Sequence, residues 1–240
     1  MFFVAVFIVA LLSGATATVV GFGIGSLMTP LLAIKFGTTT AVALVTLPHA
    51  AATAVRCWRL RADVNRTVLM RFGLLSAAGA LAGALIYTRL GPGALTRVLG
   101  GLLLLTAVAQ LSGWATRWQP RGPVVAFFGL LSGFFGGIAG NQGGLRSAAL
   151  TAFGLSPLGF VATATATGLL VDAARTPIYL WHAGPLMLTF WAPIVVATVG
   201  VLIGTIVGER ILMGLSPRRF GQTIGVAIGA LGMWMLLRSV

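Results

Sequence analysis

Two glycine-rich stretches set the organisation of this chain: GFGIG at residues 21–25 and GNQGG at residues 140–144. Each stretch interrupts an apolar run, and each has matching neighbours on both sides. Ser13-Gly14 precedes the first stretch and Phe36-Gly37 follows it, whereas Ser132-Gly133 and Phe153-Gly154 flank the second. A pattern that recurs after about 120 residues predicts an internal duplication.

The duplication predicts two halves, residues 1–119 and 120–240, within a single transmembrane domain spanning residues 1–240. A second pair of motifs continues the repeat, because Gly79-x3-Gly83 in the first half is echoed by Gly200-x3-Gly204 in the second. We interpret these four glycines as helix-packing positions. Neither half has a polar surface of its own, so the halves are expected to fold together.

The composition predicts an integral membrane protein. Of 240 residues, 58% are hydrophobic and only 8% are charged, which is too few charges to cover a water-soluble surface. The chain carries 16 Lys and Arg against 3 Asp and Glu, and these basic residues lie between apolar runs, which is typical of topology signals rather than of nucleic-acid binding. Its lone cysteine and two histidines argue against a disulfide scaffold or a metal site.

Spanning helices of about 20 residues are predicted by the long apolar runs, which are 2–20, 40–57, 68–88, 97–115, 122–139, 158–180, 186–207 and 220–238. Two shorter pieces, 26–35 and 145–154, follow the glycine stretches. The expected fold is therefore an all-α integral membrane protein with two repeats. Each repeat has four long transmembrane helices plus one broken half-helix after a glycine-rich motif. The first apolar segment is expected to be retained rather than cleaved as a signal.

The placement of basic residues favours inverted repeats. If each short piece crosses the membrane together with its glycine stretch, each half has five crossings, and basic residues divide 10 to 4 between the two sides. If the short pieces are re-entrant, the division is 8 to 6. The positive-inside rule therefore favours inverted halves. Broken helices at matching positions of inverted halves are typical of the central site of a secondary transporter.

The half-helices supply candidate anion sites, because the N-terminus of a helix carries free N–H groups and the positive end of its dipole. Close helix packing is the alternative role for glycines at these positions. The expected substrate-binding residues are Gly21, Gly23, Gly25, Asn141, Gln142, Gly143, Gly144, Arg146 and Arg175.

The chain resembles the sulfite exporter TauE/SafE family, also called the toluene sulfonate uptake permease family. The resemblance rests on the glycine run that closes the first helix, Pro30 after it, the small residues Thr40-Ala41-Val42-Ala43, and the repetition of the whole pattern. It implies a bacterial inner-membrane transporter of small sulfur-containing anions such as sulfite or organosulfonates. The chain departs from the family pattern at Phe22 and Ile24, where the family has more glycines, and at Asn141 and Gln142.

Arg146 lies in the first turn of the second half-helix, where a cation is unfavourable both to the helix dipole and to the surrounding hydrocarbon. A bound oxyanion would relieve both penalties and would match the planar guanidinium. The alternatives are that Arg146 snorkels to an interface or pairs with Asp172.

Asp172 and Arg175 share one helix face. In one interpretation they form an internal pair. In the other, Asp172 carries a proton and Arg175 is a second anion contact. His49 follows Pro48 within a span, where it either couples protons or bonds the carbonyl that the proline leaves free. Asp172 and His49 are the candidates for proton coupling. The arginine-dense run from Arg56 to Arg71 is expected to be an orientation signal that contacts lipid phosphates.

The leading hypothesis is a multi-pass secondary transporter that moves a small anion across the bacterial inner membrane, with proton coupling. A passive anion channel and a non-transporting membrane assembly protein are the alternatives. No nucleophile–base constellation indicates an enzyme. No cofactor or metal is expected. The expected partners are a small anionic substrate and membrane lipids, nucleic acid is excluded, and assembly as a homo-oligomer is left open.

Overall fold

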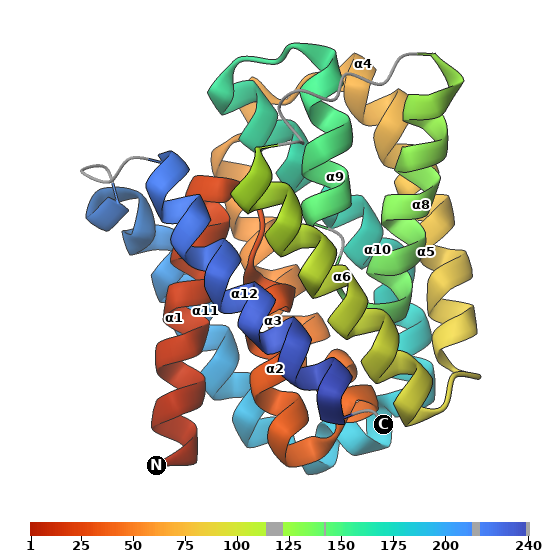
Figure 1. Cartoon of the computed structure of the whole chain (residues 1–240), viewed down its shortest axis with the longest axis vertical. Helices are drawn as coiled ribbons and strands as arrows, with labels where there is room; N and C mark the ends of the chain where they lie inside the picture. Colours follow the sequence, from red (N-terminus) through yellow and green to blue (C-terminus); the bar gives the residue numbers. More distant parts are fainter. Residues whose placement is uncertain (114–121, 142, 213–216, 239–240) are drawn as a thin grey trace.

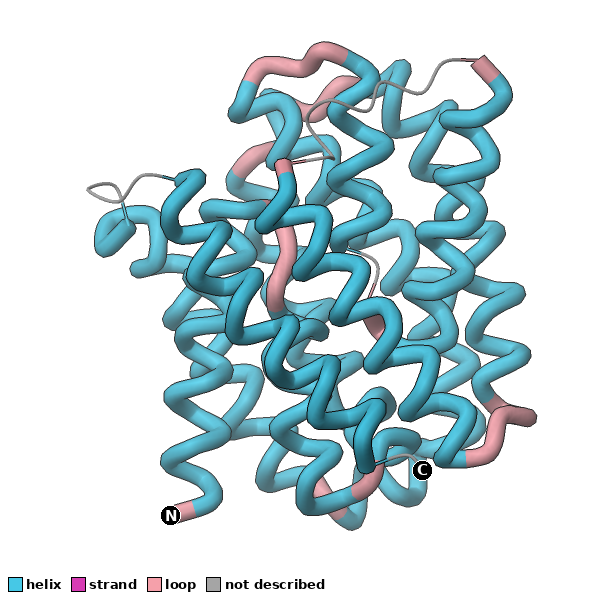
Figure 2. Tube along the Cα trace, viewed as in Figure 1, coloured by secondary structure: helices cyan, strands magenta, loops and turns pink. Residues whose placement is uncertain are grey.

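The computed structural model describes residues 1–113, 122–141, 143–212 and 217–238, and within these residues it contains only helices and short loops (Figure 2). The first half forms helices α1 (Phe2–Val20), α2 (Ile24–Phe36), α3 (Thr38–Arg59), α4 (Arg66–Val68), α5 (Leu74–Tyr87) and α6 (Pro92–Ser112). The second half forms α8 (Pro123–Ala139), α9 (Gly143–Leu150), α10 (Pro157–Thr189), α11 (Trp191–Leu212) and α12 (Pro217–Arg238). Single turns η1 (Arg61–Asp63) and η3 (Thr151–Phe153) and a π-helical turn η2 (Leu69–Gly73) complete the chain.

Six helical runs among the described residues are long and apolar enough to cross a membrane: α1, α3, the run from Arg66 to Tyr87, α6, α10 and α11. Large apolar side chains such as Ile8, Leu85 and Val199 remain exposed on these helices. An exposed apolar belt of this kind suits lipid rather than water. The chain is therefore an all-helical, multi-pass membrane protein.

One predicted break between spans was wrong, and one predicted long span is a shorter helix. The predicted break between spans 158–180 and 186–207 lies inside α10, which continues to Thr189 and contains both Pro177 and Pro185. Prolines within a spanning helix are tolerated because neighbouring helices and side chains satisfy the freed backbone groups. At α8 the helix has only 17 residues and falls among the shorter apolar helices rather than the long spans.

The two short pieces form the helices α2 and α9, as the sequence predicts, and both begin directly after a glycine break. Long helices from the two halves pair closely: α1 packs on α11, α5 on α8, and α6 on α12. Glycines make these contacts tight. A Cβ added to Gly83 would lie 2.1 Å from the carbonyl oxygen of Phe134, and one added to Gly204 would lie 2.0 Å from that of Leu11. The packing role predicted for these glycines is confirmed.

Matching helices of the two halves run in opposite directions in Figure 1. Helix α1 rises from the N-terminus whereas α8 descends, α3 rises whereas α10 descends, and α6 rises whereas α12 descends. The pairings are reciprocal as well, because α1 packs on α11 in the same way that α8 packs on α5. Helices α3 and α10 pack against each other, and both carry buried charged side chains: Arg56 on α3 and Asp172 and Arg175 on α10.

Candidate anion-binding site

Glycine conformation creates both helix breaks. Gly21 ends α1 with φ 84° and Gly140 ends α8 with φ 68°, and in each case the glycine N–H closes the last helical turn. A residue with a Cβ strains at such positive φ values. Gly23 has φ 137° and turns the chain into α2. The glycines that define the repeat therefore end one helix and redirect the chain into the next.

The two breaks meet at the centre of the molecule. A Cβ on Gly25 would lie 2.2 Å from the carbonyl oxygen of Gly140, so the first turn of α2 rests directly on the second break. The Ser26 hydroxyl donates a hydrogen bond of 3.0 Å to the amide oxygen of Asn141. On the other side, Phe22 packs against Gly143, where a Cβ would lie 2.2 Å from the Phe22 Cβ. The structure thus brings together the two glycine clusters that the sequence singles out.

A small cavity lies between the breaks and has room for about one water molecule. Its polar walls come from α3, from the second break and from α9. Its lining consists of Ala17, Phe22, Gly23, Ile24, Gly25, Ser26, His49, Arg56, Gly140, Asn141, Gly143 and Arg146. Gly144 instead faces Thr106 of α6, with a Cβ position 2.5 Å from the Thr106 Oγ1. Gln142, which the sequence also nominates, lies outside the described residues.

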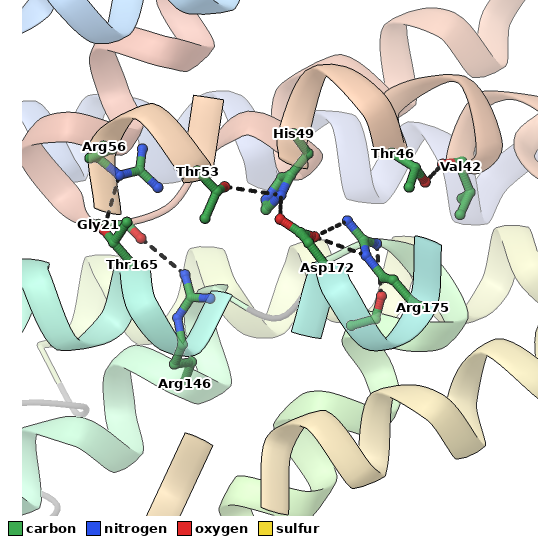
Figure 3. A network of polar contacts seen from close by, with 11 residues as sticks. Gly21, Val42, Thr46, His49, Thr53, Arg56, Arg146, Thr165, Asp172 and Arg175 are labelled. Carbon is green, nitrogen blue, oxygen red and sulfur yellow. Dashed lines mark hydrogen bonds and ion pairs between the residues drawn. The ribbon is translucent and has the colours of Figure 1, made fainter. Parts of the chain in front are cut away.

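Arg146 projects from α9 into this cavity and is only 3% exposed. One terminal nitrogen, Nη2, donates a 3.0 Å hydrogen bond to the carbonyl oxygen of Gly21 (Figure 3). Its Nε and Nη1 atoms are buried without a hydrogen-bond partner. The alternative pairing of Arg146 with Asp172 is absent from the described contacts. The side chain therefore links the second half-helix to the first glycine break and retains free donors.

Arg56 is the residue that the sequence interpretation missed. Expected to be an orientation signal at the lipid surface, it is instead 4% exposed and lines the cavity. Its Nε donates to the Thr165 hydroxyl at 3.0 Å, and its Nη1 is buried without a partner. The signal that identifies it is helical spacing: His49, Thr53 and Arg56 stand at i, i+4 and i+7 and so share one face of α3. Arg56 therefore departs from the role that the sequence predicts for the arginine-dense run as a whole.

A second cluster adjoins the cavity (Figure 3). The Asp172 carboxylate on α10 lies 2.7 Å from the Nδ1 of His49 on α3, and its other oxygen accepts two hydrogen bonds from Arg175, at 3.0 and 2.8 Å. The Thr53 hydroxyl also contacts His49 Nδ1, at 3.3 Å. Asp172 and Arg175 are each 1% exposed. The internal pair predicted from the sequence is confirmed, and His49 is joined to it.

Arg175 faces α8 rather than the cavity. Its Nη1 donates a 3.0 Å hydrogen bond to the carbonyl oxygen of Gly136, and the next turn of α10 places the Tyr179 hydroxyl on the carbonyl of Gly137. Because Nε and Nη2 both donate to Asp172, all three guanidinium nitrogens of Arg175 are hydrogen-bonded to protein groups. Arg175 does not line the cavity. Arg56 lines it instead, in the position of the second anion contact that the sequence analysis predicted for Arg175.

The charges around the cavity do not balance. Arg175 is offset by Asp172, but no described carboxylate pairs with Arg56 or Arg146. The amide nitrogen of Asn141 is a further buried donor without a partner. Two guanidinium charges and four buried nitrogen donors without a partner thus belong to residues that line one cavity of a membrane protein, where an uncompensated charge is costly. No group of three His, Cys, Asp or Glu side chains that could hold a metal occurs among the described residues. The arrangement is suited to an anion.

Comparison with known proteins agrees with this chemistry. Among curated proteins and solved structures, none matches the chain. One family model does match, over residues 6–235, and its description is sulfite exporter TauE/SafE. That family consists of membrane transporters of the sulfite-exporter type rather than enzymes. The match covers nearly the whole chain, from within α1 to within α12. The chain therefore belongs to the sulfite exporter TauE/SafE family.

Proposed function

We propose that this protein is a secondary transporter of sulfite, an organosulfonate or a related small sulfur oxyanion, which binds in the cavity between the two glycine breaks. The observation that carries the proposal is the pair of buried arginines, Arg56 and Arg146, which face one cavity with unpartnered N–H groups. A buried cation that lacks its counter-ion destabilises the protein by several kcal/mol, on the order of 3–5. An oxyanion would supply that counter-ion from outside.

The proposed ligand contacts follow from the donors that remain free. Nη1 of Arg56 and Nε and Nη1 of Arg146 would donate to the oxygens of the anion, and the Asn141 amide nitrogen would donate from the second break. Hydrogen bonds between a guanidinium and an oxyanion are shorter and stronger than neutral ones. The glycines at 23, 25 and 143, which line the cavity, would let the backbone approach the ligand. Two positive charges without a carboxylate suit a doubly charged anion such as sulfite.

We further propose that the halves act as inverted repeats that rock against each other. The opposite directions of matching helices in Figure 1 and their reciprocal packing support this proposal. The cavity has room for about one water molecule, so a four-atom anion would need the surrounding elements to separate. Movement of one half against the other around a central site would open it to each side in turn.

Proton coupling through His49 and Asp172 is part of the same proposal. His49 both lines the cavity and contacts Asp172 at 2.7 Å, so a change in its protonation would alter the charge that the anion meets. Imidazole is the side chain whose charge changes most readily near neutral pH. The family resemblance supports the bacterial inner membrane as the location, with the anion and membrane lipids as partners.

The proposal is tested by uptake of labelled sulfite into proteoliposomes, with and without an imposed pH gradient. We expect uptake in the wild type that increases with the gradient, and uptake near the protein-free background in Arg146→Ala. Arg59→Ala is the matched control, because Arg59 lies on α3 but is exposed. Unchanged uptake in Arg146→Ala would refute the site. Uptake that ignores the gradient would instead indicate a passive channel.

A further inference from the structure

A separate cavity of about 440 Å³ lies on the flank of the molecule between α6, α8 and α9. Its walls are apolar, with Val98, Leu102 and Leu105 from α6 and Leu131 and Phe135 from α8. Leu105 is 45% exposed, so the cavity is a groove that is open to the surrounding hydrocarbon. Nothing in the anion site described above uses this groove.

One charged residue lines the groove. Arg97 stands in the second turn of α6, is exposed, and makes no hydrogen bond or ion pair with any described residue. The lining continues along α6 from Arg97 to Ala109, which at 1.5 Å per residue is about 18 Å. Half of a bilayer's hydrocarbon core measures about 15 Å. The groove thus has a cation at one end and an apolar trough as long as one leaflet.

We propose that this groove is a binding site for one anionic phospholipid, with an acyl chain along α6 and its phosphate on Arg97. Lys and Arg near a membrane surface attract anionic headgroups, and the long arginine stem lets the guanidinium reach the headgroup level. A trough that lacks polar groups other than this cation matches an acyl chain better than a soluble metabolite.

The bound lipid would also contact α9, the half-helix that carries Arg146 of the anion cavity. Leu145 and Ala148 of α9 line the groove, whereas Arg146, which lies between them in the sequence, lines the anion cavity. Helix α9 has only eight residues, so a lipid chain would cover the face that the protein leaves open. Lipid binding is therefore expected to stabilise the half-helix that carries Arg146. The lipid site itself does not depend on what the protein transports.

The test measures heat unfolding of delipidated, detergent-solubilised protein as phosphatidylglycerol or phosphatidylcholine is added. We expect phosphatidylglycerol to raise the Tm by about 3 °C or more and phosphatidylcholine to raise it less. Arg97→Gln should respond equally to the two lipids. Gly101→Phe should respond to neither, because Gly101 lines the groove and a Cβ there has no neighbour within 4 Å, so the ring would fill the trough. Gly93→Phe is the control, since Gly93 lies on the same helix with equal space but outside the groove.

Native mass spectrometry gives a second readout, which does not require the Gly101→Phe variant to fold. The wild type should retain one phosphatidylglycerol, and Arg97→Gln should retain it with about fivefold lower affinity. Equal stabilisation of the wild type by both lipids, or a full phosphatidylglycerol response in Gly101→Phe, would overturn the proposal. A change of oligomeric state in Gly101→Phe would assign the groove to a second copy of the chain and would also overturn it.

Discussion

Helices α3 and α10 carry arginines at matching positions, but their neighbours differ, and we propose that only the arginine without a carboxylate binds the anion. The same 119 residues separate Arg56 from Arg175 and Gly21 from Gly140. On α10 the residue three positions earlier is Asp172, which binds Arg175 twice. On α3 the equivalent residue is Thr53, and Arg56 keeps a buried nitrogen without a partner. One carboxylate therefore distinguishes an arginine that braces the fold from one that is available to an anion.

The two glycine breaks differ from each other in the same manner. The first offers Phe22 as an apolar wall and the Gly21 carbonyl, which accepts a hydrogen bond from Arg146. The second offers Asn141, whose amide nitrogen stays free, and Arg146 itself one turn into α9. The two halves of the chain are thus chemically asymmetric, with the cavity's cations drawn from one helix of each half. Four variants test how far this asymmetry matters.

The largest effect is expected from Arg175→Met. This change leaves the buried Asp172 carboxylate with His49 as its only described ionic partner and removes the hydrogen bond to Gly136. Loss of one member of a buried pair costs about 3–5 kcal/mol of unfolding free energy. Denaturant-induced unfolding in mixed micelles would measure it, with the exposed Arg71→Met as control. A loss below about 1 kcal/mol would show that Arg175 does not brace the fold.

Arg56→Met should behave in the opposite way. Because the guanidinium lacks a described carboxylate, its replacement by an apolar side chain is expected to leave the free energy of unfolding equal or higher. Sulfite affinity should fall by about thirtyfold, the equivalent of about 2 kcal/mol for a charged hydrogen bond. Calorimetric titration of the purified protein would measure the affinity. Unchanged affinity would remove Arg56 from the site.

Thr53→Asp would copy the α10 arrangement onto α3. The new carboxylate, three residues before Arg56, is expected to pair with it and to lower sulfite affinity by about tenfold. Thr53→Asn is the matched control, because it has nearly the same shape without the charge. If both variants weakened binding equally, loss of the Thr53 contact with His49, rather than charge compensation, would be the cause.

The smallest effect is expected from His49→Gln. Protonation of His49 would add a positive charge beside the cavity, so wild-type affinity for an anion should rise by about threefold as pH falls from 7 to 5. An alkyl sulfonate is the probe, since its own charge is constant over this range. The variant should show the same affinity at both pH values. A pH response that survives in His49→Gln would place the titrating group elsewhere.

Much of the fold could be predicted from the sequence, because long apolar runs interrupted by glycines are compatible with few other structures in a membrane. The predicted span 2–20 coincides with α1, since an uninterrupted apolar run ends at Gly21. The end of α10 was missed because His182 and Pro185 resemble a loop, whereas the helix continues through them to Thr189. A proline stops a helix only where its neighbours cannot satisfy the freed carbonyl.

The site was only partly predictable for a different reason. Arg146, Asn141 and His49 stand out as polar residues inside apolar segments. Arg56 does not, because it opens a run of arginines at the end of a span, where positive charge ordinarily marks topology. Arg56 is buried where it bonds Thr165 of α10, and such a contact between the two halves cannot be recognised in the sequence alone. The remaining sequence signal is the spacing of 119 residues between Arg56 and Arg175, which equals the spacing between Gly21 and Gly140.

The double variant Arg56→Met/Arg146→Met tests both proposed anion ligands at once, through its Tm measured with and without sulfite beside the wild type. If both arginines are uncompensated cations reserved for an anion, the variant without sulfite should unfold at the wild-type temperature or above it. Sulfite should then raise the Tm of the wild type only. A variant that unfolds far below the wild type, or that sulfite still stabilises, would contradict the account.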